Sequence, residues 1–151
     1  MFVAMAQALR IAVAGLGTLL TASVAAASPL ITEHEAQLPL DPSVLRVGIE
    51  RGPDVVQVYP GPNSGALRSP FNFRVRFEAH GGTRVDLDSV SVVYKRLPSI
   101  DLTERVRPFL RATGIDMPNA EVPAGIHRIW IFLKDSAGHD NKAEIRFEVT
   151  K

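Results

Sequence analysis

The clearest pattern in the chain is a strict alternation of apolar and polar residues from position 71 to position 78. Phenylalanine or valine occupies every odd position of this run, and asparagine, arginine or glutamate occupies every even one. Because successive side chains of a strand point to opposite faces, the run predicts a β-strand with one buried and one solvated face. Shorter runs rich in β-branched and aromatic residues at 55–59 and 90–94 predict two more strands.

The last quarter of the chain predicts a β-hairpin. Two strand-like runs, 125–134 and 142–150, flank a turn in which Asp135 can bond its own backbone and Gly138 can take a positive φ. The residues expected to face the core are Ile129, Ile131 and Leu133 on the first strand, with Ala143, Ile145, Phe147 and Val149 on the second.

One short helix is predicted between positions 101 and 111. Asp101 can act as its N-cap, and Glu104 follows at the spacing that satisfies free backbone N–H groups in the first turn. Pro108 limits the helix, because proline lacks an N–H and biases the preceding residue away from helical angles. Short strands punctuated by 11 prolines and 11 glycines, with one minor helix, indicate an all-β antiparallel β-sandwich.

Two stretches resemble bacterial Ig-like domains. Residues 123–138 contain a Pro-x-Gly, an alternating strand and an Asp-x-x-Gly turn, and with the strand at 147–149 they resemble the final hairpin of such domains. Residues 60–65, followed by the Ser-Pro-Phe of 69–71, resemble the opening two strands. The resemblance covers about residues 54–150 and implies an Ig-like β-sandwich with one short helix, in an exported protein of the periplasmic type. Fold alone does not define function.

Residues 1–27 predict a cleavable signal peptide. Arg10 precedes an apolar core at 11–20, and three alanines end at Ala27, so cleavage there would make Ser28 the new N-terminus. An uncleaved anchor is the alternative, but a spanning helix needs about 20 apolar residues and this run is shorter. The predicted organisation is a signal peptide at 1–27, an extended N-terminal surface segment at 28–53 and a domain at 54–151. The expected location is the periplasm or the cell exterior, with no membrane attachment after cleavage.

Charge and composition narrow the function classes. The chain has 17 basic and 16 acidic residues, and loss of Arg10 with the signal peptide makes the mature chain formally neutral. Without clustered positive charge, nucleic-acid binding is not expected. The absence of cysteine excludes thiol catalysis and an N-terminal lipid-modified cysteine.

No catalytic residues and no cofactor are predicted. The chain has no Gly-x-Ser-x-Gly elbow, and its four histidines show no spacing that suggests a nucleophile and base. Metal binding is the alternative, with Asp135, His139 and Asp140 as weak candidates, because their turn is similar to one in a periplasmic copper-binding β-sandwich family. The chain departs from that family near the mature N-terminus, where Ser28 stands in place of a histidine and His34 is the nearest imidazole.

Two surfaces are candidates for binding a protein or glycan partner. The first is the face of Arg128, Trp130, Phe132 and Lys134, which combines aromatic and cationic side chains as binding patches do. The alternative is that Val106, Phe109 and Leu110 of the helical segment cover it.

The second candidate is the group of Arg105, Arg107 and Arg111, which could recognise a carboxylate or sugar phosphate or simply be solvated. The sequence therefore predicts an exported, non-catalytic interaction module. The alternatives are a periplasmic copper-type metal-binding protein and a structural subunit that assembles through an exposed strand edge.

Overall fold

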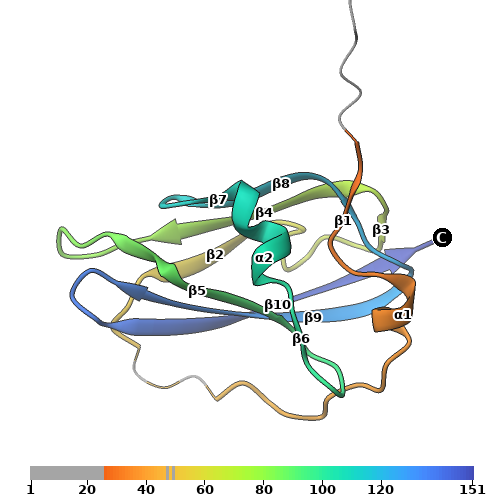
Figure 1. Ribbon diagram of the computed structural model, residues 1–151, viewed down its shortest axis with the longest axis horizontal. Helices are drawn as coiled ribbons and strands as arrows, with labels where there is room; N and C mark the ends of the chain where they lie inside the picture. Colours follow the sequence, from red (N-terminus) through yellow and green to blue (C-terminus); the bar gives the residue numbers. More distant parts are fainter. Residues whose placement is uncertain (1–25, 47, 49) are drawn as a thin grey trace, which may run out of the picture.

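Two β-sheets lie with their apolar faces together in the computed structural model, which describes residues 26–46, 48 and 50–151 (Figure 1). The first sheet has the order β1 (Ser28–Pro29), β8 (Gly114–Glu121), β4 (Phe71–Glu78) and β2 (Asp54–Tyr59), with β7 (Leu110–Arg111) paired to β8. The second has the order β3 (Leu67–Arg68), β10 (Asp140–Thr150), β9 (Gly125–Asp135), β5 (Val85–Tyr94) and β6 (Ile100–Asp101). The predicted all-β, two-sheet arrangement is confirmed, but it is not wholly antiparallel, because the short edge strands β1 and β3 pair parallel with β8 and β10.

The predicted alternation of the strands is also confirmed. Every odd residue of β4 is buried and every even one is exposed. In the hairpin, β9 and β10 pair antiparallel, with Ile129 opposite Ile145, and both side chains lie in the core. The rings of Phe71 on β4 and Phe147 on β10 meet edge to face at 5.6 Å between centroids, which joins the two sheets.

Strand β8 was not predicted, although it lies between β1 and β4. Pro118 interrupts its sequence, and proline normally argues against a strand inside a sheet. The ladder to β4 is irregular at this point, because its register shifts between Phe71 and Phe73, and Pro118 is exposed. Ile115 and Met117 are nonetheless buried in the core.

The predicted short helix is present as α2 (Thr103–Val106), continued by a 3-10 turn, η1 (Arg107–Phe109), that contains Pro108. The N-cap position falls on Leu102 rather than on Asp101. Asp101 Oδ1 still accepts a hydrogen bond from the Thr103 backbone N–H at 2.8 Å, so the carboxylate serves the first turn from one residue earlier. Leu102 and Val106 are fully buried, and α2 lies along one side of the two sheets (Figure 1).

The prediction that residues 28–53 form an extended surface segment is wrong for their first part. β1 pairs with β8, and Leu30 and Ile31 are buried in the core. A four-residue helix follows, α1 (Glu33–Ala36), which begins with a complete capping box between Thr32 and Glu35. Leu30 and Ile31 are buried because β1 pairs with the edge of β8. Two adjacent apolar residues show no periodicity, so the local sequence gives no sign of this pairing.

The predicted signal peptide lies outside the described residues up to position 25. Ala26 and Ala27 are described and exposed, and they lead directly into β1. Within the described part of the chain, no helix is long and apolar enough to cross a membrane.

Candidate functional site

The tryptophan of the predicted aromatic face is partly buried. Its Nε1–H donates to Glu144 Oε2 on the neighbouring strand at 2.8 Å, and Lys95 Nζ lies 4.1 Å from the centroid of the Trp130 ring. Phe132 packs edge to face against the same ring. The Trp130 ring therefore makes its polar, cationic and aromatic contacts with residues of the same chain.

Residues 41–43 bind two cationic side chains that lie beside Trp130. Arg128 donates to the backbone carbonyls of Asp41 and Ser43 at 3.0 and 2.9 Å, and Lys95 forms an ion pair with Asp41 at 2.7 Å. Hydrogen bonds from Lys95 and Ser43 hold the pKa of the Asp41 carboxyl well below its usual range. The alternative that the helical segment covers this face is wrong, since α2 packs on β5 and η1 and puts Val106 into the core between the sheets.

The three predicted arginines have different partners. Arg105 holds Glu35 through two hydrogen bonds of 2.6 and 2.8 Å and donates to the Leu30 carbonyl at 3.0 Å. This pairing lowers the pKa of Glu35 from 4.5 to about 2. Arg107 pairs with Glu104 at 2.9 Å on the surface. Arg105 is thus a structural tie between α1 and α2.

The predicted metal turn is closed by its own hydrogen bonds. Asp135 Oδ1 accepts from the backbone N–H groups of Ala137 and His139 at 2.9 Å each, and Asp135 Oδ2 lies 3.1 Å from His139 Nδ1. Burial opposes ionisation of Asp135, but these hydrogen bonds lower its pKa overall. Asp140 is exposed, and the described residues hold no group of three or more His, Cys, Asp or Glu side chains placed to bind a metal ion.

A buried polar chain joins β5 to the start of β9. Arg96 Nε donates to the Tyr94 hydroxyl at 2.8 Å, the hydroxyl lies 2.9 Å from His127 Nδ1, and His127 Nε2 lies 2.8 Å from the Pro123 carbonyl. The carbonyl can only accept, so Nε2 carries the proton and Nδ1 accepts from Tyr94. Burial lowers the pKa of His127, which agrees with a neutral ring. Tyr94 and His127 are fully buried, so this hydrogen-bonded network serves the structure and not a ligand.

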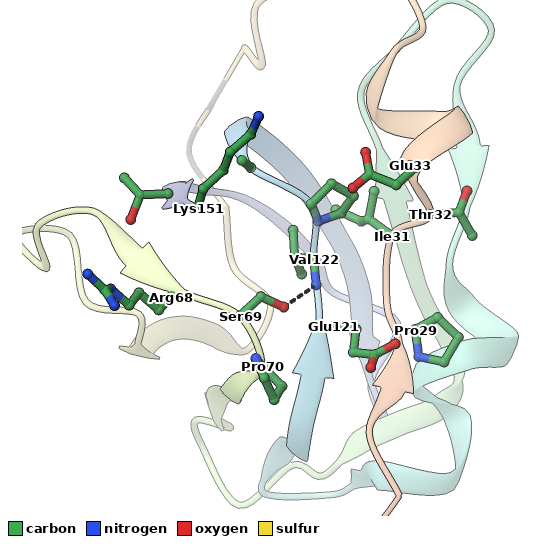
Figure 2. Close-up of a pocket in the computed structure, with 13 residues that line it drawn as sticks. Pro29, Ile31, Thr32, Glu33, Arg68, Ser69, Pro70, Glu121, Val122 and Lys151 are labelled. Carbon is green, nitrogen blue, oxygen red and sulfur yellow. Dashed lines mark hydrogen bonds between the residues drawn. The ribbon is translucent and has the colours of Figure 1, made fainter.

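An open groove lies at one end of the two sheets, between β1 and β3 (Figure 2). Its volume of about 740 Å³ lies within the range of ligand pockets. Ser69 Oγ accepts from the Val122 backbone N–H at 2.9 Å, which ties the start of β4 to the end of β8 across the groove. Arg68 and Pro70 line one side, and both also line a second hollow on the outer face of β4.

The outer face of β4 carries a set of side chains that we call the arginine face: Tyr59, Arg74, Arg76, Arg111 and Asp116. Arg74 and Asp116 stand opposite each other on β4 and β8, with side chains that are 50% and 62% exposed. Tyr59 stands opposite Arg74 on β2 and is 42% exposed. Three hollows meet on this face, and Arg74 lines all of them.

Arg111 joins the arginine face from β7, away from the other two predicted arginines. Its Nη1 donates to the backbone carbonyls of Pro108 and Leu110 at 3.2 and 2.8 Å, which fixes the guanidinium beside Asp116 and Arg74. Gly114 separates Arg111 from Arg76 across the sheet, because it pairs with both. A Cβ at Gly114 would overlap the Val75 carbonyl oxygen, so only glycine fits there.

The sequence indicated some residues of the arginine face but did not identify them as one site. The alternation over 71–78 places Arg74 and Arg76 on the solvated face, and Arg111 was a candidate. Their meeting depends on β8, which the sequence did not predict. No family model matches the chain, and neither a curated protein nor a solved structure matches it.

Proposed function

We propose that the chain is an exported, non-catalytic interaction module with an Ig-like sandwich, and that it binds a macromolecular partner through the arginine face. The predicted signal peptide at 1–27 supports export. The resemblance of the last hairpin to that of bacterial Ig-like domains supports the Ig-like class. The choice of surface follows from comparing the outer faces of the two sheets.

The observation that carries the choice is the difference in exposure between the cations beside Trp130 and the arginines of β4. On the sheet with Trp130, the side chains of Arg128 and Lys95 are only 15% and 11% exposed, and both are bound to residues 41–43. On the other sheet, Arg74 and Arg76 pair with surface carboxylates, Asp116 and Glu78, and remain 50% and 56% exposed, next to the exposed Tyr59. Arginine and tyrosine are enriched where proteins contact partners, so the second face is the better contact surface.

A photo-crosslinking amino acid at position 72 tests the proposal in cells that export the full-length chain. Asn72 lies on the outer face of β4 and lines two of the hollows. We expect a crosslinked adduct from position 72 and its loss on Arg74→Ala. A crosslinker at Glu148, an exposed residue of β10, is the control. Equal adducts from both positions, or none from position 72, would refute the assignment.

Export itself is tested by the mass of the protein recovered from the cell envelope. Cleavage after Ala27 predicts a mature chain that begins at Ser28. Recovery of the uncleaved chain from the cytoplasm alone would contradict the exported location.

A further inference from the structure

We infer that the arginine face recognises an extended, acidic segment of a partner protein, laid along β4. The inference rests on the proposed function and deepens it by naming the chemistry of the partner. It follows from the spacing of the arginines, the mixed charge of the surface and the apolar side chains among the charges.

The spacing of the arginines matches an extended chain. Arg74 and Arg76 point to the same side of β4, and residues two apart in a strand lie about 7 Å from each other. Alternate side chains of an extended partner repeat at the same interval, so two carboxylates at positions i and i+2 can meet the two guanidinium groups in turn. Planar guanidinium groups bind carboxylates through two parallel hydrogen bonds.

Three hollows surround Arg74 on this face. The first extends from Pro70 to Arg74, the second from Asn72 to Arg111, and the third from Arg74 to Arg76 and Gly114. The first and third hollows follow one another along β4, from Pro70 to Arg76, so an occupant that fills both has to extend along the strand. An extended segment has this shape, whereas a small ligand would fill one hollow and leave the others empty.

The charges favour a mixed rather than a uniformly negative partner. The arginines of this region outnumber its carboxylates, since Arg68, Arg74, Arg76 and Arg111 lie near Asp116 and Glu78. A uniformly charged polyanion would meet the two carboxylates unfavourably. A polypeptide can place its acidic residues on the arginines and other residues on Asp116. A bound carboxylate replaces Asp116 at Arg74 and Glu78 at Arg76. The Arg74–Asp116 pair joins at 3.4 Å and the Arg76–Glu78 pair at 2.8 Å, both between side chains that are about half exposed, so exchanging these surface pairs costs little.

Apolar side chains complete the surface. Val58 and Tyr59 at the end of β2 are 38% and 42% exposed, and both line the first of these hollows. They offer contacts to apolar residues that alternate with acidic ones in the bound segment. Sugar polymers bearing only sulfate or carboxylate groups would leave these side chains unused.

The inference is tested by titrating the isotope-labelled protein with a synthetic glutamate–tyrosine copolymer, following backbone amide shifts by NMR and affinity by calorimetry. A lysine–tyrosine copolymer and heparin are the comparison probes. We expect shifts along β4 and β8 with the acidic copolymer, and about tenfold or more weaker binding for Arg74→Ala and for Arg111→Ala. Arg84→Ala, an exposed arginine outside the face, should bind like the parent.

Three outcomes would overturn the inference: no binding of the acidic copolymer, equal binding of the lysine copolymer, or heparin binding as tightly to the same amides. The arginine variants must retain the thermal midpoint of the parent. Failure here is distinguishable from failure of the proposed function. An adduct from position 72 that forms in cells while the acidic copolymer does not bind would leave the interaction module standing and remove the acidic partner.

Discussion

The ion pair between Glu35 and Arg105 makes a sharp prediction, because it ties the N-terminal residues to the rest of the fold. Arg105 holds both carboxylate oxygens of Glu35 and also donates to the carbonyl of the buried Leu30. The Glu35→Gln variant removes the charge but keeps a side chain that can complete the capping box with Thr32. The variant therefore isolates the ionic contribution.

The magnitude follows from the lowered pKa of Glu35. A shift from 4.5 to about 2 sets an upper limit of ~3 kcal/mol on the stabilisation. A third of the Arg105 side chain is exposed, so solvent screening reduces the expected loss on Glu35→Gln to about 1–2 kcal/mol. For a domain of this size that corresponds to about 4–8 °C in the thermal midpoint.

Urea unfolding of the parent and of Glu35→Gln, measured across pH, checks this reasoning. The folded carboxyl has the lower pKa, so its stabilisation is complete above pH 4.5 and disappears as the pH falls through about 2. Glu33→Gln, two residues earlier on the exposed surface of α1, is the matched control and should lose less than about 0.5 kcal/mol. Equal stability of the two variants at pH 7, or a difference that persists at pH 2, would refute the assigned tie.

Three further predictions concern other parts of the fold. Stability should fall as the pH drops below 6.5, because the unfolded chain binds a proton that buried His127 takes up less readily; His127→Gln should flatten this slope in urea titrations. Gly114→Ala should cost ~2 kcal/mol or more in calorimetric unfolding, since a Cβ there overlaps a β4 carbonyl, while Gly65→Ala, with open space around it, should cost far less. Acrylamide should quench the emission of the partly buried Trp130 weakly in the parent and more strongly in Arg128→Ala, which removes two hydrogen bonds to residues 41–43; unchanged quenching would count against a role of these contacts in shielding the ring.

The elements that the sequence predicted best are those with a local signal. Alternation alone identified β4, β9 and β10 and most of the apolar side chains they bury, because a period of two needs no knowledge of neighbouring strands. On the hairpin, Ala143 is only partly buried, and the fully buried His127 was not predicted. β8 was not predicted: a proline inside a strand normally argues against it, but the irregular ladder to β4 accommodates Pro118. Leu30 and Ile31 were missed because their burial depends on pairing with β8.

The candidate site shows the same limit. The alternation exposed Arg74 and Arg76, but their meeting with Arg111 depends on the order β4, β8, β7, which is a tertiary property. Trp130 and Phe132 share one face of β9, as predicted, but the cations beside Trp130 are bound within the chain and are not free for a partner. Residues 41–43 contact Arg128 and Lys95, which lie more than fifty residues later in the chain, and no local sequence pattern predicts such a contact.

The most direct test of the central claim compares the two sheet faces in the same cells. A photo-crosslinking amino acid is placed either at Asn72, on the arginine face, or at Phe132, beside Trp130, and adduct yields are measured with and without Arg74→Ala. The account predicts adducts from position 72 that the arginine substitution abolishes, and few from position 132. Adducts that form mainly from position 132 and ignore Arg74→Ala would contradict it and return the contact surface to the Trp130 face.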